Sequence, residues 1–321
     1  MAKIIINGGK TLNGEVKISG AKNAVLPIMS ATLLCPGKFT IYNVPDLRDT
    51  RTMMQLLEIT GAKTSFENGT VHVDTNDVNN PEAPYDLVKT MRASFYVLGP
   101  LISRFGKVQV SLPGGCAWGP RPVDYHLKGL EKLGANLDLE GGNILAEADE
   151  LIGCDIHFEF PSVGATGNLA MSAVRAKGVT RLFNCAKEPE ITQLCEFLNS
   201  MGANIKGIGT DSLIIEGVKE LNQADITVIP DRIEAGTFLM AGALNGKIKI
   251  NNVIPLHLEK VTNKLIETGC QININDDSIS ITPPENLKSV DMKTAVFPGF
   301  PTDLQAQWVA LMSLSDSSSI V

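Results

Sequence analysis

The feature that most constrains this chain is a pattern that recurs at intervals of about 70 residues. Each occurrence ends an amphipathic segment with a glycine, and these glycines are Gly61, Gly134, Gly202 and Gly269. Glycine is favoured just beyond a helix C-terminus, because the chain there commonly takes a positive φ. An alternating strand-like run follows each glycine, as at residues 212–216 and 278–281. The pattern predicts repeated helix–strand units.

A second marker precedes the first in each repeat. It is an apolar segment that ends in glycine, at residues 24–37, 93–106, 169–178 and 237–246. Because these segments are apolar nearly all round, we expect helices that are buried inside a domain. The helices that end at the first marker have one polar face and should lie outside. Each repeat of this α/β chain should therefore run as helix, strand, helix and two paired strands, an α+β repeat.

The repeat count bears on the end of the chain. Four repeats are complete, and a fifth begins with an apolar segment at residues 302–314, shortly before the sequence ends at residue 321. A stacked fold rarely ends inside a repeat, so we expect a C-terminally truncated protein. A natural short form that is capped in another way is the alternative. We also expect the half-repeat to expose four apolar side chains, Phe297, Phe300, Trp308 and Leu311.

Length and composition narrow the class of protein. A chain of 321 residues with 44% hydrophobic and 20% charged residues predicts a soluble globular protein of two domains. The net charge of −7 argues against a general nucleic-acid binder. The longest charge-free stretches are 15 residues, shorter than the ~20 that span a bilayer. Six cysteines without a CxxC pair or a secretory leader predict reduced thiols in the cytoplasm.

The most unusual segment lies at residues 111–122 and reads Ser-Leu-Pro-Gly-Gly-Cys-Ala-Trp-Gly-Pro-Arg-Pro. Its three glycines and three prolines exclude a helix or a central strand, so we expect a loop. Free backbone N–H groups and Arg121 would lower the pKa of Cys116 from its reference value of about 8.5. Cys116 is therefore either a reactive thiol or an inert packed cysteine, and the local pattern leaves both open.

Cations stand at the entrances of two predicted buried helices. Lys22 precedes the first and Arg92 the second. A cation at a helix N-terminus opposes the positive end of the helix dipole, so it needs a compensating anion. A solvated Lys22 is the alternative. Because Arg92 places a second cation at the equivalent position of the next repeat, an anion site is favoured. Ser162, Val163 and Gly164 open the third repeat and could present amides to a diphosphate.

Asp303 and the histidines carry two weaker signals. Asp303 begins the helix of the fifth repeat, where a role as N-cap is the simpler account. The four histidines have no metal-ligand spacing, so neither a metal nor another cofactor is expected.

Together these motifs resemble those of the UDP-N-acetylglucosamine 1-carboxyvinyltransferases, a family of enolpyruvyl transferases. The matching segments are residues 20–24, 89–94, 112–124, 162–166, 188–190 and 300–307. The likeness runs along the whole chain, and the cysteine loop is its most specific part. It implies a two-domain inside-out α/β barrel, with one domain at residues 21–229 and an incomplete second domain from residues 1–20 plus 230–321. The missing end would be roughly a hundred residues, the last repeat and a half.

The resemblance implies a reaction as well. The enolpyruvyl group of phosphoenolpyruvate would pass to the 3′-hydroxyl of UDP-N-acetylglucosamine, with release of phosphate, as the first committed step of peptidoglycan precursor synthesis. Lys22 and Arg121 would hold the phosphate and carboxylate of phosphoenolpyruvate. Asp303 would take the proton of the 3′-hydroxyl. Cys116 would either protonate the methylene carbon or form a covalent adduct.

The implied contacts with the nucleotide sugar are Asn23, Arg92, Arg121, Pro122, Val123, Asp124, Tyr125, Ser162, Val163, Gly164 and Asp303. Domain closure with the cysteine loop as a lid would exclude water. Two departures from the family pattern stand out. Residues 158–161 read Phe-Glu-Phe-Pro where some relatives carry a lysine, and the arginine and aspartate groups of the family's last repeat are absent from this chain.

Two other functions are open to such a chain. The sister transferase that acts on 3-phosphoshikimate shares the implied fold but has no cysteine loop, so Cys116 argues against it. A catalytically inactive nucleotide-sugar-binding protein would use residues 21–229 and would bind its ligand without releasing phosphate. The expected partners are small molecules, without membrane insertion, and the oligomeric state is left open.

Overall fold

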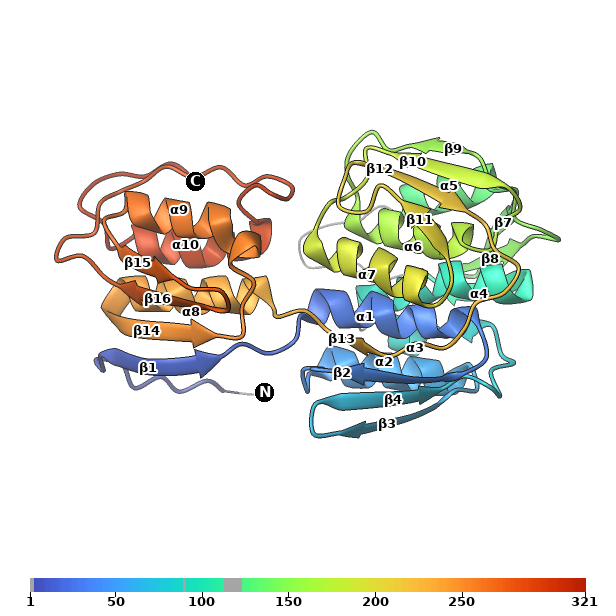
Figure 1. Ribbon diagram of the computed structural model, residues 1–321, viewed down its shortest axis with the longest axis horizontal. Coiled ribbons are helices and arrows are strands. Elements are labelled where there is room, and N and C mark those ends of the chain that lie inside the picture. Colours follow the sequence, from blue (N-terminus) through green and yellow to red (C-terminus); the bar gives the residue numbers. More distant parts are fainter. Residues whose placement is uncertain (1–2, 89–90, 113–122) are drawn as a thin grey trace. The chain divides into compact units, whose positions relative to one another are not determined.

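The computed structural model describes residues 3–88, 91–112 and 123–321, and of Arg92 the backbone alone. The chain folds into two compact units, shown in Figure 1. Unit 1 contains residues 1–19 and 230–321, and unit 2 contains residues 20–229. The chain therefore leaves unit 1 after its first strand and returns to it only after unit 2 is complete.

Unit 2 is built from three repeats in the predicted order of buried helix, strand, outer helix and hairpin. The first repeat has α1 (Lys22–Ala31), η1 (Thr32–Leu34), β2 (Lys38–Tyr42), α2 (Arg48–Ile59), β3 (Lys63–Glu67) and β4 (Thr70–Asp74). The second has β5 (Glu82–Ala83), α3 (Tyr85–Val88), η2 (Arg92–Val97), α4 (Leu98–Phe105), β6 (Lys107–Ser111), α5 (Asp124–Lys132), β7 (Asn136–Glu140) and β8 (Asn143–Glu147). The third has β9 (Asp155–His157), α6 (Val163–Ala173), β10 (Val179–Phe183), α7 (Pro189–Ser200), β11 (Asn204–Lys206) and β12 (Ser212–Glu216). Strand β13 (Ile226–Thr227) ends the unit.

Unit 1 repeats the same order once and begins it again. Its elements are β1 (Leu12–Lys17), α8 (Arg232–Asn245), β14 (Gly246–Asn251), η3 (Pro255–Leu258), α9 (Glu259–Glu267), β15 (Gln271–Ile274), β16 (Ser278–Thr282), η4 (Thr302–Leu304) and α10 (Gln305–Met312). The prediction of repeated α+β units is thus confirmed in both units.

All four sheets share one topology. The strand after each buried helix pairs antiparallel with the second strand of the hairpin and parallel with one further strand. In two sheets that parallel strand comes from far along the chain. Strand β13, at the end of unit 2, pairs with β2 near its start, and β1 pairs with β14 through Leu12 and Gly246. Both units are therefore closed by contacts between distant parts of the sequence.

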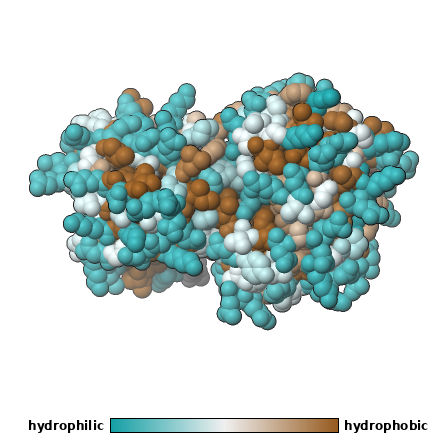
Figure 2. All heavy atoms as spheres, in the orientation of Figure 1, coloured by the Kyte–Doolittle hydropathy of each residue, from teal (hydrophilic) through white to brown (hydrophobic). Residues whose placement is uncertain are grey.

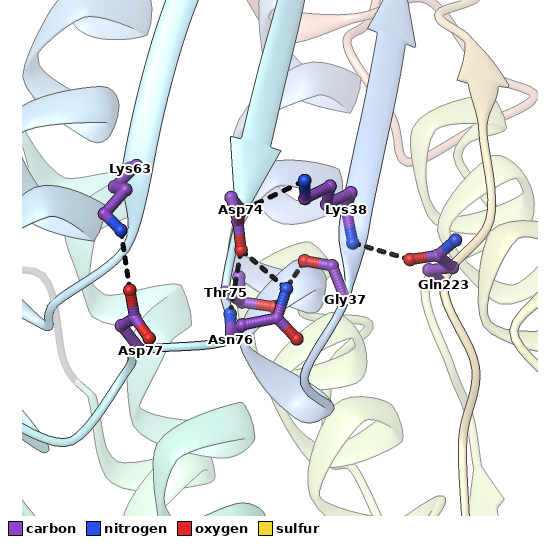
Figure 3. Close-up of polar contacts among 8 residues, drawn as sticks. All are labelled: Gly37, Lys38, Lys63, Asp74, Thr75, Asn76, Asp77 and Gln223. Atoms are coloured by element: carbon purple, nitrogen blue, oxygen red, sulfur yellow. Dashed lines mark hydrogen bonds and ion pairs between the residues drawn. The ribbon is translucent and has the colours of Figure 1, made fainter.

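Side chains next to β13 reinforce the closure of unit 2, as Figure 3 shows. Gln223 accepts a hydrogen bond of 2.7 Å from the backbone N–H of Lys38 at the start of β2. At the end of the neighbouring strand β4, the Thr75 N–H donates to Gly37 at 2.9 Å. The edge that β2 would otherwise leave open is covered by β13 and Gln223, which belong to the last segment of the unit.

The first glycine marker is confirmed in every repeat. Each outer helix ends two residues before a glycine with φ near +100°, and the values are +103° at Gly61, +97° at Gly134, +102° at Gly202 and +96° at Gly269. The second marker is less regular. Helix α4 ends at Phe105, directly before Gly106 with φ +69°, but α1 and α6 end several residues before Gly37 and Gly178. There the chain leaves the helix through short turns before it enters the next strand.

Helices α1, α4 and α6 form the centre of unit 2 with their C-termini together. Residues 24–31 of α1 and 165–173 of α6 are buried along their whole length. The Arg104 guanidinium, on the last turn of α4, donates to the carbonyl of Leu33 at 3.1 Å. Arg175 follows α6 and donates to the carbonyl of Leu34 at 3.3 Å. Because α6 packs beside both α1 and α4 and the C-terminal ends meet, the three helices run in the same direction. Their N-termini lie at the opposite end of unit 2.

The corresponding helix of unit 1 is less covered than predicted. Helix α8 buries one face, and Leu244 near its C-terminus is 39% exposed. Its described neighbours are β1, β14, β16, η3, η4, α9 and α10. The expectation of a helix buried all round is therefore wrong for α8.

The predicted exposure of apolar side chains in the fifth repeat is also wrong. Phe300 is 1% exposed, Trp308 and Leu311 are fully buried, and Phe297 is half-buried. The rings of Phe300 and Trp308 meet edge to face, with centroids 5.4 Å apart, inside the core of unit 1. Figure 2 accordingly shows hydrophilic residues over most of the visible surface of each unit, with apolar residues in scattered groups.

A buried asparagine fastens the central helices of unit 2 to one another. Asn168 in α6 is fully buried, and its Oδ1 accepts a hydrogen bond of 2.6 Å from the backbone N–H of Gly99 in α4. Its Nδ2 donates to the carbonyl of Phe95 at 3.0 Å and lies 3.0 Å from Nδ1 of His126 in α5. One side chain thus satisfies polar groups from three other elements.

We predict that Asn168→Leu lowers the free energy of unfolding of unit 2 by about 3 kcal/mol, because three buried polar groups lose their partner. Urea unfolding followed by circular dichroism measures the loss. Asn222→Ala, at an exposed position of the same unit, is the control and should change the free energy by less than about 0.5 kcal/mol. Equal losses in the two variants would contradict the role of Asn168.

Candidate functional site

The N-terminal ends of the buried helices carry most of the described residues that the sequence nominates. Lys22 and Asn23 are the first two residues of α1, and the backbone of Arg92 begins η2, which continues as α4. Ser162 is the N-cap of α6, followed by Val163 and Gly164. Since these three helices run in the same direction, the structure brings the three starting segments to one end of unit 2.

Helix α5 begins at the same end. Val123 is its N-cap residue, followed by Asp124 and Tyr125. The Tyr125 ring meets Phe158 edge to face at 6.0 Å between centroids, just upstream of the Ser162 segment. Four helix N-termini of unit 2 are therefore grouped, and we call this group the N-terminal face.

The N-terminal face suits an anion. The first backbone N–H groups of a helix have no partner within the helix, and the helix dipole adds a partial positive charge there. The N-cap of α1 is Ala21, which offers no side-chain acceptor, whereas Ser162 Oγ accepts a hydrogen bond of 3.3 Å from Ala165 N in α6. At the start of α1, therefore, no side-chain cap competes with a phosphate or carboxylate oxygen.

Lys22 has its compensating anion within the chain. Its Nζ lies 3.4 Å from Oδ2 of Asp49, which stands in the first turn of α2. The two side chains are 42% and 35% exposed, so the pair contributes at most about 1 kcal/mol to stability. A bound anion can therefore replace Asp49 as the partner of Lys22 at little cost. Sequence reasoning missed Asp49, although an acidic residue in a helix first turn was the available signal.

His126 packs against the start of α6, and sequence reasoning did not identify it either. It is 6% exposed, its ring meets Phe95 edge to face at 4.9 Å, and its Nε2 lies where a side chain on Gly164 would contact it at 3.2 Å. Because both N–H groups of the Asn168 amide are used as donors, His126 accepts through Nδ1 and carries its proton on Nε2. A lone histidine without metal spacing gave no sequence signal for this packing role.

Asp303 differs from the aspartate that begins the preceding repeat. Asp231 caps α8, where its Oδ1 accepts from the N–H groups of Ile233 at 2.8 Å and Glu234 at 3.1 Å. Asp303 lies inside η4 of unit 1 and is exposed, and among the described residues its carboxylate has no hydrogen bond or ion pair. The simpler account of Asp303 as an N-cap is therefore wrong, and its carboxylate faces solvent.

The segment that leads to Asp303 packs beside a histidine that stays neutral. The rings of His257 and Phe297 meet edge to face at 6.5 Å, and the Arg232 guanidinium carbon lies 5.7 Å from the centroid of Phe297. Burial lowers the pKa of His257 to about 4, and the positive charge of Arg232 acts in the same direction. The imidazole adds no charge to this part of unit 1 at neutral pH.

Cys116, Arg121 and Pro122 lie outside the described residues. The described chain stops at Leu112, just after β6, and resumes at Val123 on the N-terminal face. The five described cysteines are free thiols. Burial raises the pKa of Cys185 and of Cys195 to about 12, and it also raises the pKa of Cys35, Cys154 and Cys270. These five thiols are poor nucleophiles at neutral pH.

The cysteines give a direct test of the loop. We predict that iodoacetamide at pH 7.5 alkylates Cys116 at least tenfold faster than Cys185 or Cys195. A thiol with a pKa of about 12 is thiolate in fewer than about one molecule in ten thousand at that pH. Peptide mass spectrometry measures each rate, and Cys116→Ala should remove the fast phase. Alkylation of Cys116 as slow as that of Cys185 would show an inert thiol instead.

The described residues contain neither a candidate metal cluster nor a helix that could span a membrane. No group of three or more His, Cys, Asp or Glu side chains is placed to hold a metal ion in the part of the chain that the structure covers. Within the same ranges, no helix combines the length and the apolar character that a membrane crossing needs.

Comparison with known proteins places the chain among enzymes. The family described as EPSP synthase (3-phosphoshikimate 1-carboxyvinyltransferase) matches residues 6–320. UDP-N-acetylglucosamine 1-carboxyvinyltransferase of Chlorobaculum parvum is 52% identical over 325 residues, which cover 100% of this chain and 77% of that protein. The protein of the same name from Desulfosudis oleivorans is also 52% identical, over 322 residues with the same coverage.

Solved structures agree on the fold. The enolpyruvyl transferase NikO from Streptomyces tendae superposes with a TM-score of 0.87 at 24% identity, over 97% of this chain and 75% of that one. EPSP synthase from Acinetobacter baumannii gives a TM-score of 0.67 at 18% identity, over 90% of this chain and 68% of that one. The predicted fold, the two-domain α/β architecture of enolpyruvyl transferases, is confirmed.

Proposed function

This chain belongs to the UDP-N-acetylglucosamine 1-carboxyvinyltransferases of the EPSP synthase family, and we propose that it transfers the enolpyruvyl group of phosphoenolpyruvate to the 3′-hydroxyl of UDP-N-acetylglucosamine. The observation that carries the proposal is the N-terminal face. There the N-termini of α1, η2, α6 and α5 lie together, and Lys22 is the first residue of α1. Both substrates are anions with phosphate groups, and grouped helix N-termini favour such groups.

In this proposal Lys22 and Arg121 hold the phosphate and carboxylate of phosphoenolpyruvate. Asn23, Arg92, Pro122, Val123, Asp124, Tyr125, Ser162, Val163 and Gly164 bind the nucleotide sugar, together with Arg121 and Asp303. The exposed side chain of Asn23 and the uncapped start of α1 support these roles, because both are open to a ligand. The cationic groups would also stabilise the charge that moves as phosphate leaves.

The chemistry divides into an addition and an elimination. Asp303 takes the proton of the 3′-hydroxyl, and the oxygen attacks C2 of phosphoenolpyruvate while C3 gains a proton, which gives a tetrahedral ketal. Loss of a proton from C3 and of phosphate from C2 then restores the double bond. Cys116 either supplies the proton for C3 or forms a covalent adduct with phosphoenolpyruvate. The exposed carboxylate of Asp303, which caps no helix, supports its role as the base.

The cellular context follows from the same family. We assign units 2 and 1 as the two domains of the fold, and the reaction as the first committed step of peptidoglycan precursor synthesis, with consequences for cell-wall formation, cell shape and division. The five free thiols support a reducing compartment, the cytoplasm. This chain spans about three quarters of the length of the relatives it matches.

Phosphate release from phosphoenolpyruvate and UDP-N-acetylglucosamine tests the proposal. We expect release by the unaltered chain, none with 3-phosphoshikimate, and a fall of at least a hundredfold in kcat for Asp303→Asn, which removes the base. Asp276→Asn makes the same chemical change in the exposed turn between β15 and β16 and should stay within twofold of the unaltered chain.

Two further results of that assay discriminate between the functions. Loss of release in Cys116→Ala would support a part for the thiol in the reaction. Binding of UDP-N-acetylglucosamine without any phosphate release would contradict the transferase proposal and favour a nucleotide-sugar-binding protein.

A further inference from the structure

The opposite end of unit 2 carries a second concentration of positive charge. An open cleft of about 1070 Å³ lies where α4 and α6 end, lined by residues 102–107, 147–151, 175–178 and 217–219. This volume is similar to that of small-molecule sites in proteins. All of the lining belongs to unit 2, and none of it belongs to the N-terminal face.

Charges of the lining residues do not cancel. The basic residues are Arg104, Lys107, Arg175, Lys177 and Lys219, and the acidic residues are Glu147, Asp149 and Glu150, which leaves a formal excess of two positive charges. Lys177 pairs with Glu150 at 3.4 Å. Among the described residues neither arginine forms an ion pair with a carboxylate. Arg104 and Arg175 therefore share the cleft with Lys107 and Lys219, which also form no ion pair among the described residues, and the two guanidinium groups are its planar cations.

Arg104 and Arg175 lie side by side on the floor of the cleft. They donate to the successive carbonyls of Leu33 and Leu34 at the end of η1, and Arg104 also donates to the carbonyl of Thr75 at 3.2 Å. Thr75 is itself held by the contacts in Figure 3, where its N–H donates to Gly37. Burial lowers the pKa of Arg104, and the charge of Arg175 lowers it further, as expected for neighbouring like charges.

The hydrogen bonds to backbone carbonyls use only some of the N–H donors of Arg104 and Arg175. Each guanidinium carries five N–H donors. The described hydrogen bonds use two of them on Arg104 and one on Arg175. Most of the donors therefore remain for a ligand, on two planar groups that are fixed in position before any ligand arrives.

We propose that this cleft is an anion site that binds a phosphate or diphosphate group between Arg104 and Arg175, with Lys219 at its rim. Planar guanidinium groups match the oxygen spacing of phosphate, and an anion of two or more charges would remove the repulsion between them. The site lies beyond the C-terminus of α1, whose ten residues set it about 15 Å or more from Lys22. It is distinct from the site proposed for the transferase reaction.

Isothermal titration with pyrophosphate at fixed ionic strength tests the site. We expect Arg175→Gln to raise the Kd at least tenfold. The titrations are made in the Lys22→Gln background, which weakens pyrophosphate binding at the N-terminal face. In that background Arg181→Gln, which changes an exposed arginine paired with Asp155 on β9, should keep the Kd within twofold. Titrations with inorganic phosphate and with UDP then separate a free anion from a nucleotide as the source of the phosphate.

A second variant covers the case in which Arg175→Gln does not fold. Lys219 is exposed, so Lys219→Glu leaves the floor of the cleft unchanged and should raise the Kd about fivefold or more through repulsion. The proposal is overturned if pyrophosphate does not bind, if its Kd is the same in the cleft variants, or if Lys22→Gln alone removes the binding.

Discussion

The common direction of α1, α4 and α6 in the centre of unit 2 is the constraint on which its other features depend. Parallel helices add their dipoles, so one end of the bundle gathers partial positive charge and the other partial negative charge. Asn168 fixes α6 to α4 through a hydrogen bond of 2.6 Å, and Arg104 and Arg175 bind the carbonyls at the end of η1. The arrangement is thus held by polar contacts at its middle and at its C-terminal end.

The N-terminal end of this bundle is stabilised by negative charge and the C-terminal end by positive charge. At the C-terminal end the two arginines satisfy carbonyls that would otherwise be buried without partners. At the N-terminal end the chain supplies Asp49 beside Lys22, but both side chains are partly exposed and the pair is weak. A substrate phosphate can take the place of Asp49, which explains how a stable fold keeps an anion site available.

Much of this architecture could be predicted from the sequence, because its signals are local. Gly134 and its equivalents mark helix ends that require positive φ, and the apolar segments around Ala24 and Leu169 mark buried helices. Lys22 and Ser162 could be placed at helix starts for the same reason. The pairing of β1 with β14 could not be predicted, since its register depends on residues more than two hundred positions apart.

The misses share a physical cause, which is packing between elements distant in sequence. Trp308 and Leu311 were predicted to be exposed, yet α8 and the core of unit 1 bury them. His126 carries no motif, and only the fold shows that it supports Gly164 and bonds to Asn168. The roles of Cys116 and Arg121 rest on the family pattern, because both lie outside the described residues.

The central claim is that the grouped helix N-termini of unit 2, which carry Asn23, Ser162, Val163 and Gly164, bind the nucleotide sugar. Amide nuclear magnetic resonance during titration with UDP-N-acetylglucosamine tests it residue by residue. We expect the largest shifts at the amides of residues 22–24 and 163–166, where helix N–H groups face the N-terminal face. Shifts confined to other parts of the chain, with these amides unchanged at saturation, would contradict the claim.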